Sequence, residues 1–148
     1  MVLSARAQFK IPFHDIDIMN IAWHGHYLKY FEIARTALMQ SVDLDWPVLK
    51  GHNIAMPIVE AQTQYRKPIQ YDQEIVVEAS IEEYAFPELI IHYRIFAHDQ
   101  ATELLSSGRT RQVYRNLEEQ NSYFVVPELV IKRFHAAAKR GIKSCEHT

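Results

Sequence analysis

Cysteine is nearly absent from the chain: Cys145 is the single one among 148 residues. One thiol cannot form an intramolecular disulfide, and a structural zinc–thiolate site is not expected from it. The chain also lacks the run of about 20 apolar residues that a membrane span needs. Residues 1–13 contain no apolar core of a secretory signal peptide. We therefore expect a protein of a reducing, cytoplasmic compartment.

An excess of charge of either sign is also missing. Lysine and arginine total 16 against 18 aspartate and glutamate, for a net charge of −2, whereas nucleic-acid-binding proteins usually carry a strongly basic surface. Hydrophobic residues make up 48% and charged residues 23% of the chain, as in ordinary globular proteins. The length suits one domain, which we place over residues 1–148.

The first half of the chain contains one strand pattern and one helix pattern. Ala7, Phe9, Ile11 and Phe13 alternate with polar residues, which predicts a half-buried strand that Pro12 confines to an edge or ends. Tyr27, Phe31, Ala34 and Leu38 then follow a 4-3-4 spacing. That spacing predicts a long helix over about residues 27–42, with one apolar face. Residues 43–51 are expected to form a loop or a short helix.

The second half is mostly strand-like. Candidate strands cover 54–65, 73–84, 89–97 and 103–115, with the cleanest alternation of apolar and polar residues over 73–84. Pro57 is an irregularity in the first of them, and Gly108 marks a bulge or a close backbone approach in the last. Pro127, followed by Leu129, Val130 and Phe134, predicts a C-terminal helix. Because consecutive strands are joined by short links, we expect an antiparallel sheet and an α+β fold.

The segment that joins the first strand to the long helix concentrates polar side chains. It contains His14, Asp15, Asp17, His24 and His26. Unpaired N–H groups and the positive end of the helix dipole lie at such a junction, where they can polarise a substrate carbonyl. A nearby carboxylate can then attack or activate water. The residues alone leave open that Asp15 and Asp17 only cap the helix or form a turn.

Two stretches of this region resemble the signature of the hot-dog-fold thioesterases, and in particular the 4-hydroxybenzoyl-CoA thioesterases. They are Phe13-His14-Asp15-Ile16-Asp17 and the run from Trp23 to Arg35, which ends in Glu-x-Ala-Arg. Pro57-Ile58-Val59, Tyr65-Arg66-Lys67-Pro68 and Gly108 resemble further motifs of that family. The resemblance covers about residues 7–114.

The resemblance implies a hot-dog fold, in which an antiparallel sheet wraps around one long helix. The core would span about residues 5–116, and residues 117–148 would form an extension with a short C-terminal helix. Proteins of this family generally form homodimers or homotetramers by pairing sheets edge to edge, with the active sites at the dimer interface. They need no cofactor.

The resemblance also assigns roles to residues. Asp17 matches the catalytic carboxylate, as nucleophile or general base, and His24 takes the place of a histidine that assists catalysis in one branch. Backbone N–H groups around Trp23 and His24 would hold the carbonyl oxygen. Trp23 and Tyr27 are expected to bind substrate, and the CoA phosphates would need cations, for which the chain offers Arg66, Lys67 and Arg109.

The chain departs from the family pattern in three places. Phe13 stands where one branch has a catalytic tyrosine, and Asn20 stands where the turn usually carries glycine, although asparagine tolerates positive φ. Residues 82–88 are acidic and apolar, whereas aromatic-acyl thioesterases carry basic residues there. This last difference weakens any assignment to 4-hydroxybenzoyl-CoA itself.

The sequence therefore predicts hydrolysis of acyl-CoA or acyl-carrier-protein thioesters to free acid and thiol. The main alternative is a non-catalytic hot-dog protein that binds acyl thioesters. A metal-binding hydrolase built on His14, Asp15, Asp17, His24 and His26 is less favoured, because no motif such as His-Glu-x-x-His supports it. The length of the acyl chain is not predicted.

Overall fold

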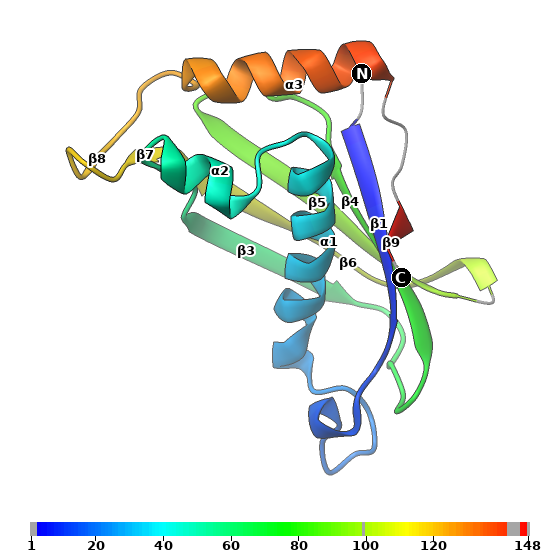
Figure 1. Ribbon diagram of the computed structural model, residues 1–148. Coiled ribbons are helices and arrows are strands. Elements are labelled where there is room, and N and C mark those ends of the chain that lie inside the picture. Colours follow the sequence, from blue (N-terminus) through cyan, green and yellow to red (C-terminus); the bar gives the residue numbers. More distant parts are fainter. Residues whose placement is uncertain (1–2, 99, 142–145, 148) are drawn as a thin grey trace.

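The structure is a computed structural model that describes residues 3–98, 100–141 and 146–147, so that Cys145 lies outside the described residues. It is built on one sheet in the order β3-β6-β5-β4-β1-β9 (Figure 1). Neighbouring strands are antiparallel except β9, which runs parallel to β1. The strands are β1 (Leu3–Lys10), β3 (Ile58–Tyr65), β4 (Glu74–Ile81), β5 (Glu88–Ala97), β6 (Gln100–Val113) and β9 (Glu146–His147).

The long helix α1 (Tyr27–Ser41) packs against one face of this sheet (Figure 1). Its sequence contains neither glycine nor proline, which suits a regular helix. The apolar stripe predicted for it is buried, since Tyr27, Phe31, Ala34 and Leu38 expose at most 3% of their surface. The inward residues of the strands, such as Ile75 and Val77, complete the core against it. The predicted α+β arrangement of an antiparallel sheet around one long helix is confirmed.

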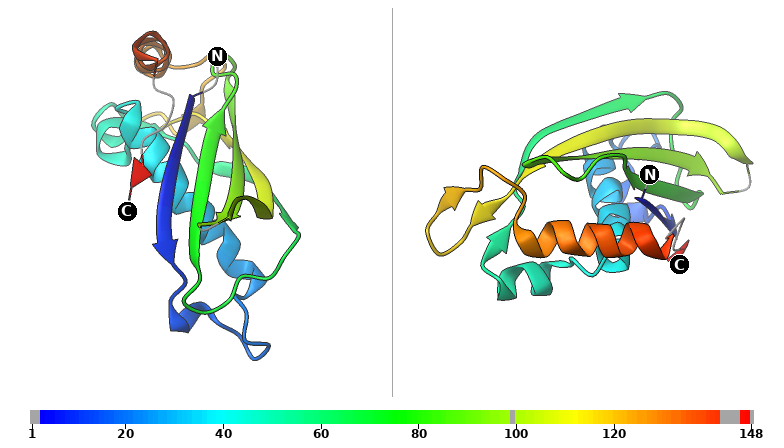
Figure 2. Two further views of the ribbon diagram at one scale, coloured as in Figure 1. Left: turned by 90° about the vertical axis from the view of Figure 1, so that its right-hand side faces the viewer. Right: turned by 90° about the horizontal axis from the view of Figure 1, so that it is seen from above.

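Two further helices and a second, smaller sheet complete the fold. The helices α2 (Trp46–Gly51) and α3 (Glu128–Arg140) lie on the same side of the sheet as α1 (Figure 2). A second sheet of three short strands has the order β2-β7-β8. Its strands are β2 (Ile54–Ala55), β7 (Arg115–Asn116) and β8 (Asn121–Ser122). Among the described residues, no helix is long and apolar enough to cross a membrane.

The boundaries differ from the prediction at two strands. β1 ends at Lys10, and Phe13 instead belongs to the 3-10 helix η1 (Phe13–Asp15) with 77% of its surface exposed. The alternation extends to Phe13, but the strand ends before Pro12, which is one of the two outcomes predicted for this proline. The strand predicted over 54–65 is divided into β2 and β3 around Pro57, as the proline suggested.

Gly108 in β6 lies against the Phe31 ring of α1. The Phe31 ring stacks on that of Tyr93, with 4.6 Å between the ring centroids, and Tyr93 is the cross-strand partner of Gly108. A Cβ at position 108 would lie 2.5 Å from Phe31 Cε2 and 2.6 Å from the Gln62 carbonyl oxygen. The predicted close approach is thus present, and the ladder register shows no bulge at this residue.

We expect Gly108→Ala to lower the free energy of unfolding by about 1–3 kcal/mol, because overpacking displaces backbone or a buried ring. Chemical denaturation measures the change. Gly51→Ala is the matched control, since an added Cβ there meets nothing within 4 Å; it should leave stability unchanged or raise it. Equal stability of Gly108→Ala and the wild type would show that Phe31 does not rest on this glycine.

Candidate functional site

The residues between β1 and α1 form a compact turn around Asp17. The Asp17 carboxylate oxygen Oδ1 accepts a hydrogen bond of 2.8 Å from the Met19 N–H. The Asp17 N–H donates to the Ile21 carbonyl at 2.9 Å. Asn20 adopts a φ of 65°, so asparagine takes the left-handed position where the family usually has glycine. These bonds leave the second oxygen, Oδ2, without a hydrogen bond within the part of the chain that the structure describes.

Asp15 connects this turn to α1. Its carboxylate is 1% exposed and accepts hydrogen bonds from Lys29 Nζ at 2.6 Å and from the Tyr30 hydroxyl at 2.8 Å. Its carbonyl oxygen accepts the Trp23 N–H at 3.0 Å. Burial alone would raise the pKa of the Asp15 carboxyl, but the bonds from Lys29 and Tyr30 outweigh burial and lower that pKa. Asp15 is therefore a charged structural anchor.

A pocket of about 310 Å³ opens beside the Asp17 turn; we call it the Asp17 pocket. Five residues predicted for the site line it: Asp17, His24, Tyr27, Arg66 and Lys67. They come from three places in the chain, namely the turn, the start of α1 and the residues after β3. The remaining lining residues are Met19, Ile21, Ala22, Tyr65 and Pro68.

Tyr65, at the end of β3, fixes the helix start against the sheet. Its hydroxyl donates to the His24 carbonyl at 2.8 Å, and its ring meets that of Tyr27 edge-on, with centroids 4.8 Å apart. The sequence analysis named Tyr65 only as part of a motif and did not assign it to the site. The available signal was its place in the Tyr65-Arg66-Lys67-Pro68 motif, whose two cations were assigned to the site.

Two of the predicted substrate-binding residues do not line the pocket. Trp23 lies next to it, 47% exposed, with its ring 5.0 Å from that of His24 and packed over Gly25. Arg109 is on the far face of the sheet, where its guanidinium pairs with Glu60 at 3.0 Å and donates to Gln62 at 3.1 Å. Within one chain, the structure does not bring Arg109 to the Asp17 pocket.

Two backbone N–H groups at the start of the helix remain unbonded among the described residues. The short 3-10 helix η2 (His24–His26) precedes α1, and the His26 N–H is bonded to the Trp23 carbonyl. The Trp23 N–H is engaged by Asp15, contrary to the expectation that it would hold a substrate oxygen. The N–H groups of His24 and Gly25 have no acceptor among the described residues. They are the donors that remain for a carbonyl oxygen.

The histidines of this segment do not converge on a cation. The Nε2 atoms of His14 and His26 lie 3.5 Å and 3.9 Å from Asp15 Oδ1. The same oxygen already forms an ion pair with Lys29 Nζ. Within the described residues, no group of three or more histidine, cysteine, aspartate or glutamate side chains is arranged to hold a metal ion.

The fold and this pocket together define a hot-dog protein with a carboxylate at the start of its long helix. Residues 11–138 match the model of the Thioesterase-like superfamily, and the chain belongs to that family. Solved thioesterases share its fold.

Individual relatives are distant. The chain is 26% identical over 92 residues to the proposed acyl-CoA thioesterase YneP of Bacillus subtilis, covering 62% of this chain and 67% of that protein. A DHNA-CoA thioesterase from Staphylococcus aureus superposes with a TM-score of 0.79 at 20% identity, covering 98% and 99% of the two chains. SAV2348 from the same species, solved in complex with CoA, gives a TM-score of 0.79 at 16% identity and covers 94% and 85%.

We expect Asp15→Asn to lower the free energy of unfolding at neutral pH by about 1–3 kcal/mol, because a buried charged hydrogen bond is lost. The carboxyl has a lowered pKa in the folded state. Its stabilising effect is therefore present above the unfolded pKa of about 3.9 and is lost as pH falls through the lowered value.

Denaturation of both proteins between neutral and acid pH measures this effect, and the difference in stability should shrink toward acid. Asp72→Asn is the control, since Asp72 is exposed at a turn with a φ of 60°, which asparagine also adopts. A stability difference that stays constant with pH would contradict the lowered pKa of Asp15.

Proposed function

We propose that the protein hydrolyses acyl-CoA thioesters in the Asp17 pocket. The observation that carries this proposal is the convergence of the Asp17 carboxylate, His24, Tyr27 and the cations Arg66 and Lys67 on one pocket. The names of several relatives refer to CoA thioesters, and this favours CoA over a carrier protein as the thiol group.

The chemistry follows from where the groups lie. The thioester carbonyl oxygen accepts from the N–H groups of His24 and Gly25, which stabilise negative charge as it develops. The free oxygen of Asp17 either attacks the carbonyl carbon or takes a proton from the water that does. The C–S bond then breaks, and the leaving thiolate takes up a proton, for which His24 in the pocket lining is a candidate donor. Where Asp17 is the nucleophile, water then hydrolyses the acyl–Asp17 anhydride and frees the carboxylate. The products are the free acid and CoA.

The phosphates of CoA are assigned to Arg66 and Lys67. Both line the pocket next to Pro68, and the Lys67 ammonium is also paired with Glu103 at 2.9 Å. Among the described residues Arg66 makes no ion pair, so it is the more available of the two.

A cytoplasmic location and a single domain over residues 1–148 stay predictions. Burial of Val130, Phe134 and Ala137 of α3 in the common core supports the single domain.

The chain is expected to act as a homodimer joined through β3. This strand is the outer edge of the sheet, and all but two of its eight residues are exposed. An exposed edge of this length has a row of backbone groups ready to pair with another strand. Pairing of two copies would also cover Ile58, Val59 and Tyr65, which are 40–51% exposed. A tetramer would need a second contact.

Asp17→Asn should lower kcat for acyl-CoA hydrolysis by at least about a hundredfold, because it removes the base or nucleophile. Release of the CoA thiol measures the rate. Glu118→Gln removes the same charge at an exposed turn outside the pocket and should retain full activity. A folded Asp17→Asn protein with wild-type activity would exclude the mechanism, and an inactive wild type that binds acyl-CoA would favour the non-catalytic alternative.

Val59→Lys should weaken the dimer, because a charged side chain on an edge strand opposes pairing with another edge. Sedimentation velocity over a range of protein concentrations measures the dissociation. Val125→Lys is the matched control, since Val125 is 70% exposed between β8 and α3. If the wild type sediments as a monomer, or both variants dissociate alike, β3 is not the contact.

A further inference from the structure

The Tyr65 hydroxyl binds a peptide group that the proposed reaction uses. It donates to the His24 carbonyl at 2.8 Å, and the Tyr27 N–H donates to the same carbonyl. Both lone pairs of this oxygen are therefore occupied. The carbonyl of His24 and the N–H of Gly25 belong to one planar peptide group, so the bonds that fix the carbonyl also fix the direction of the N–H.

A bond to the carbonyl also makes the N–H of the same peptide group a stronger donor. The two groups point in opposite directions and share the resonance of the C–N bond. Hydrogen bonds joined through such a group polarise one another, by about 10–30% per bond. The Gly25 N–H has no acceptor among the described residues, so a thioester carbonyl bound to it would receive this gain.

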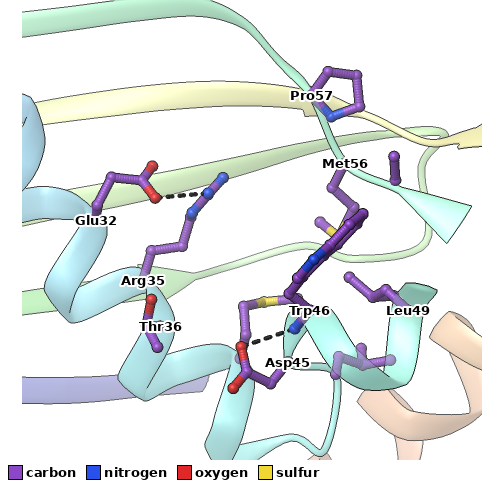
Figure 3. A pocket seen from close by; sticks show the side chains of 11 residues that line it. Glu32, Arg35, Thr36, Asp45, Trp46, Leu49, Met56 and Pro57 are labelled. Carbon is purple, nitrogen blue, oxygen red and sulfur yellow. Dashed lines mark hydrogen bonds and ion pairs between the residues drawn. The ribbon is translucent and has the colours of Figure 1, made fainter. Parts of the chain in front are cut away.

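The start of α1 is stabilised in a different way from the start of α2. Figure 3 shows the Asp45 carboxylate at the first N–H of α2, where it accepts from Trp46 at 2.8 Å. No side-chain hydrogen bond caps η2 or α1, whose N-cap residues are Trp23 and His26. A capping side chain would occupy N–H groups that the reaction needs. Tyr65 instead binds this segment from the carbonyl side and leaves the N–H groups unoccupied.

The Trp23 ring makes a second contact with the same segment. It packs over Gly25, where a Cβ would lie 2.2 Å from a ring carbon. Its centroid is 5.0 Å from that of the His24 ring and 5.4 Å from that of the His26 ring. The ring limits the access of water to this peptide group, and a hydrogen bond is stronger where water is excluded.

We propose that Tyr65 is a positioning residue for thioester hydrolysis, whose hydroxyl holds the His24 carbonyl so that the Gly25 N–H is aimed at the thioester oxygen. The inference rests on the proposed function. Tyr65 does not donate to the substrate, because its one hydroxyl proton is already given to His24. Its effect is expected mainly in the transition state, where the thioester oxygen carries more negative charge than in the bound ester.

The first test is Tyr65→Phe, which removes the hydroxyl and keeps the ring. We expect kcat for butanoyl-CoA to fall about three- to tenfold, as for the loss of one neutral hydrogen bond. KM should change by less than about twofold. Tyr71→Phe is the matched control, since Tyr71 is 52% exposed against 51% for Tyr65 and does not line the Asp17 pocket; it should keep the wild-type kcat.

The second test measures the substrate carbonyl directly and needs no turnover. Butanoyl-CoA with carbon-13 at the carbonyl is bound to Asp17→Asn, and difference infrared spectroscopy records its C=O stretch. Because hydrogen bonds lower this frequency, the bound ester should absorb below the free ester. Adding Tyr65→Phe should move the band back toward the free value, whereas adding Tyr71→Phe should leave it in place.

The outcomes separate this inference from the proposed function. If the wild type leaves butanoyl-CoA intact, the proposed function fails. If the wild type hydrolyses the ester while Tyr65→Phe keeps its kcat, or leaves the infrared band unmoved, the Asp17 mechanism stands and the role of Tyr65 is wrong. A higher KM at the wild-type kcat would make Tyr65 a binding contact and would also overturn the inference.

Discussion

The buried carboxylate of Asp15 is the contact on which the geometry of the site depends. It binds Lys29 and Tyr30 of α1 through its side chain and the Trp23 N–H through its carbonyl. One residue therefore holds both ends of the turn that contains Asp17 against the first turn of the helix. Because Lys29 compensates the charge, the carboxylate is retained in a site that is 1% exposed. The neighbouring Asp17 keeps its oxygen Oδ2 without a hydrogen bond among the described residues.

The same arrangement explains why the two acidic residues of one short motif have different properties. Asp15 has its oxygens occupied by a cation and a hydroxyl, whereas Asp17 has one oxygen bound to a backbone N–H and the other open to a pocket. The tyrosine at the end of β3 completes the site from the opposite side by binding the His24 carbonyl. Strand, turn and helix are thus joined around the Asp17 pocket.

Much of the fold was predictable from the sequence, because its main elements have strong periodic patterns. The α1 stripe and the alternation of β4 and β5 determine which faces are buried, and the structure confirms them. The end of β1 was predicted only as one of two options, since Phe13 fits the alternation and Pro12 is compatible with either an edge strand or a strand end. Asn20 was predicted well, because its tolerance of positive φ is a local property.

The candidate site was predictable only as far as it is local. Asp17, His24 and Tyr27 follow one another along the chain, and the resemblance to a known family added Arg66 and Lys67 from the end of β3. The contact of Tyr65 with His24 spans 41 residues and has no local pattern. Arg109 was predicted as a cation for the CoA phosphates. Strand alternation instead places it on the face of the sheet away from α1, beside Glu60 and Gln62.

The central claim, that this protein hydrolyses acyl thioesters, is tested most directly by turnover of butanoyl-CoA in water enriched in oxygen-18. Mass spectrometry of the acid and a thiol assay of free CoA follow both products of the reaction. The account predicts that CoA and butanoate form in equal amounts and that the butanoate carries one solvent oxygen. Intact butanoyl-CoA recovered from a folded, ligand-bound protein would contradict it and identify a protein that binds the ester without hydrolysing it.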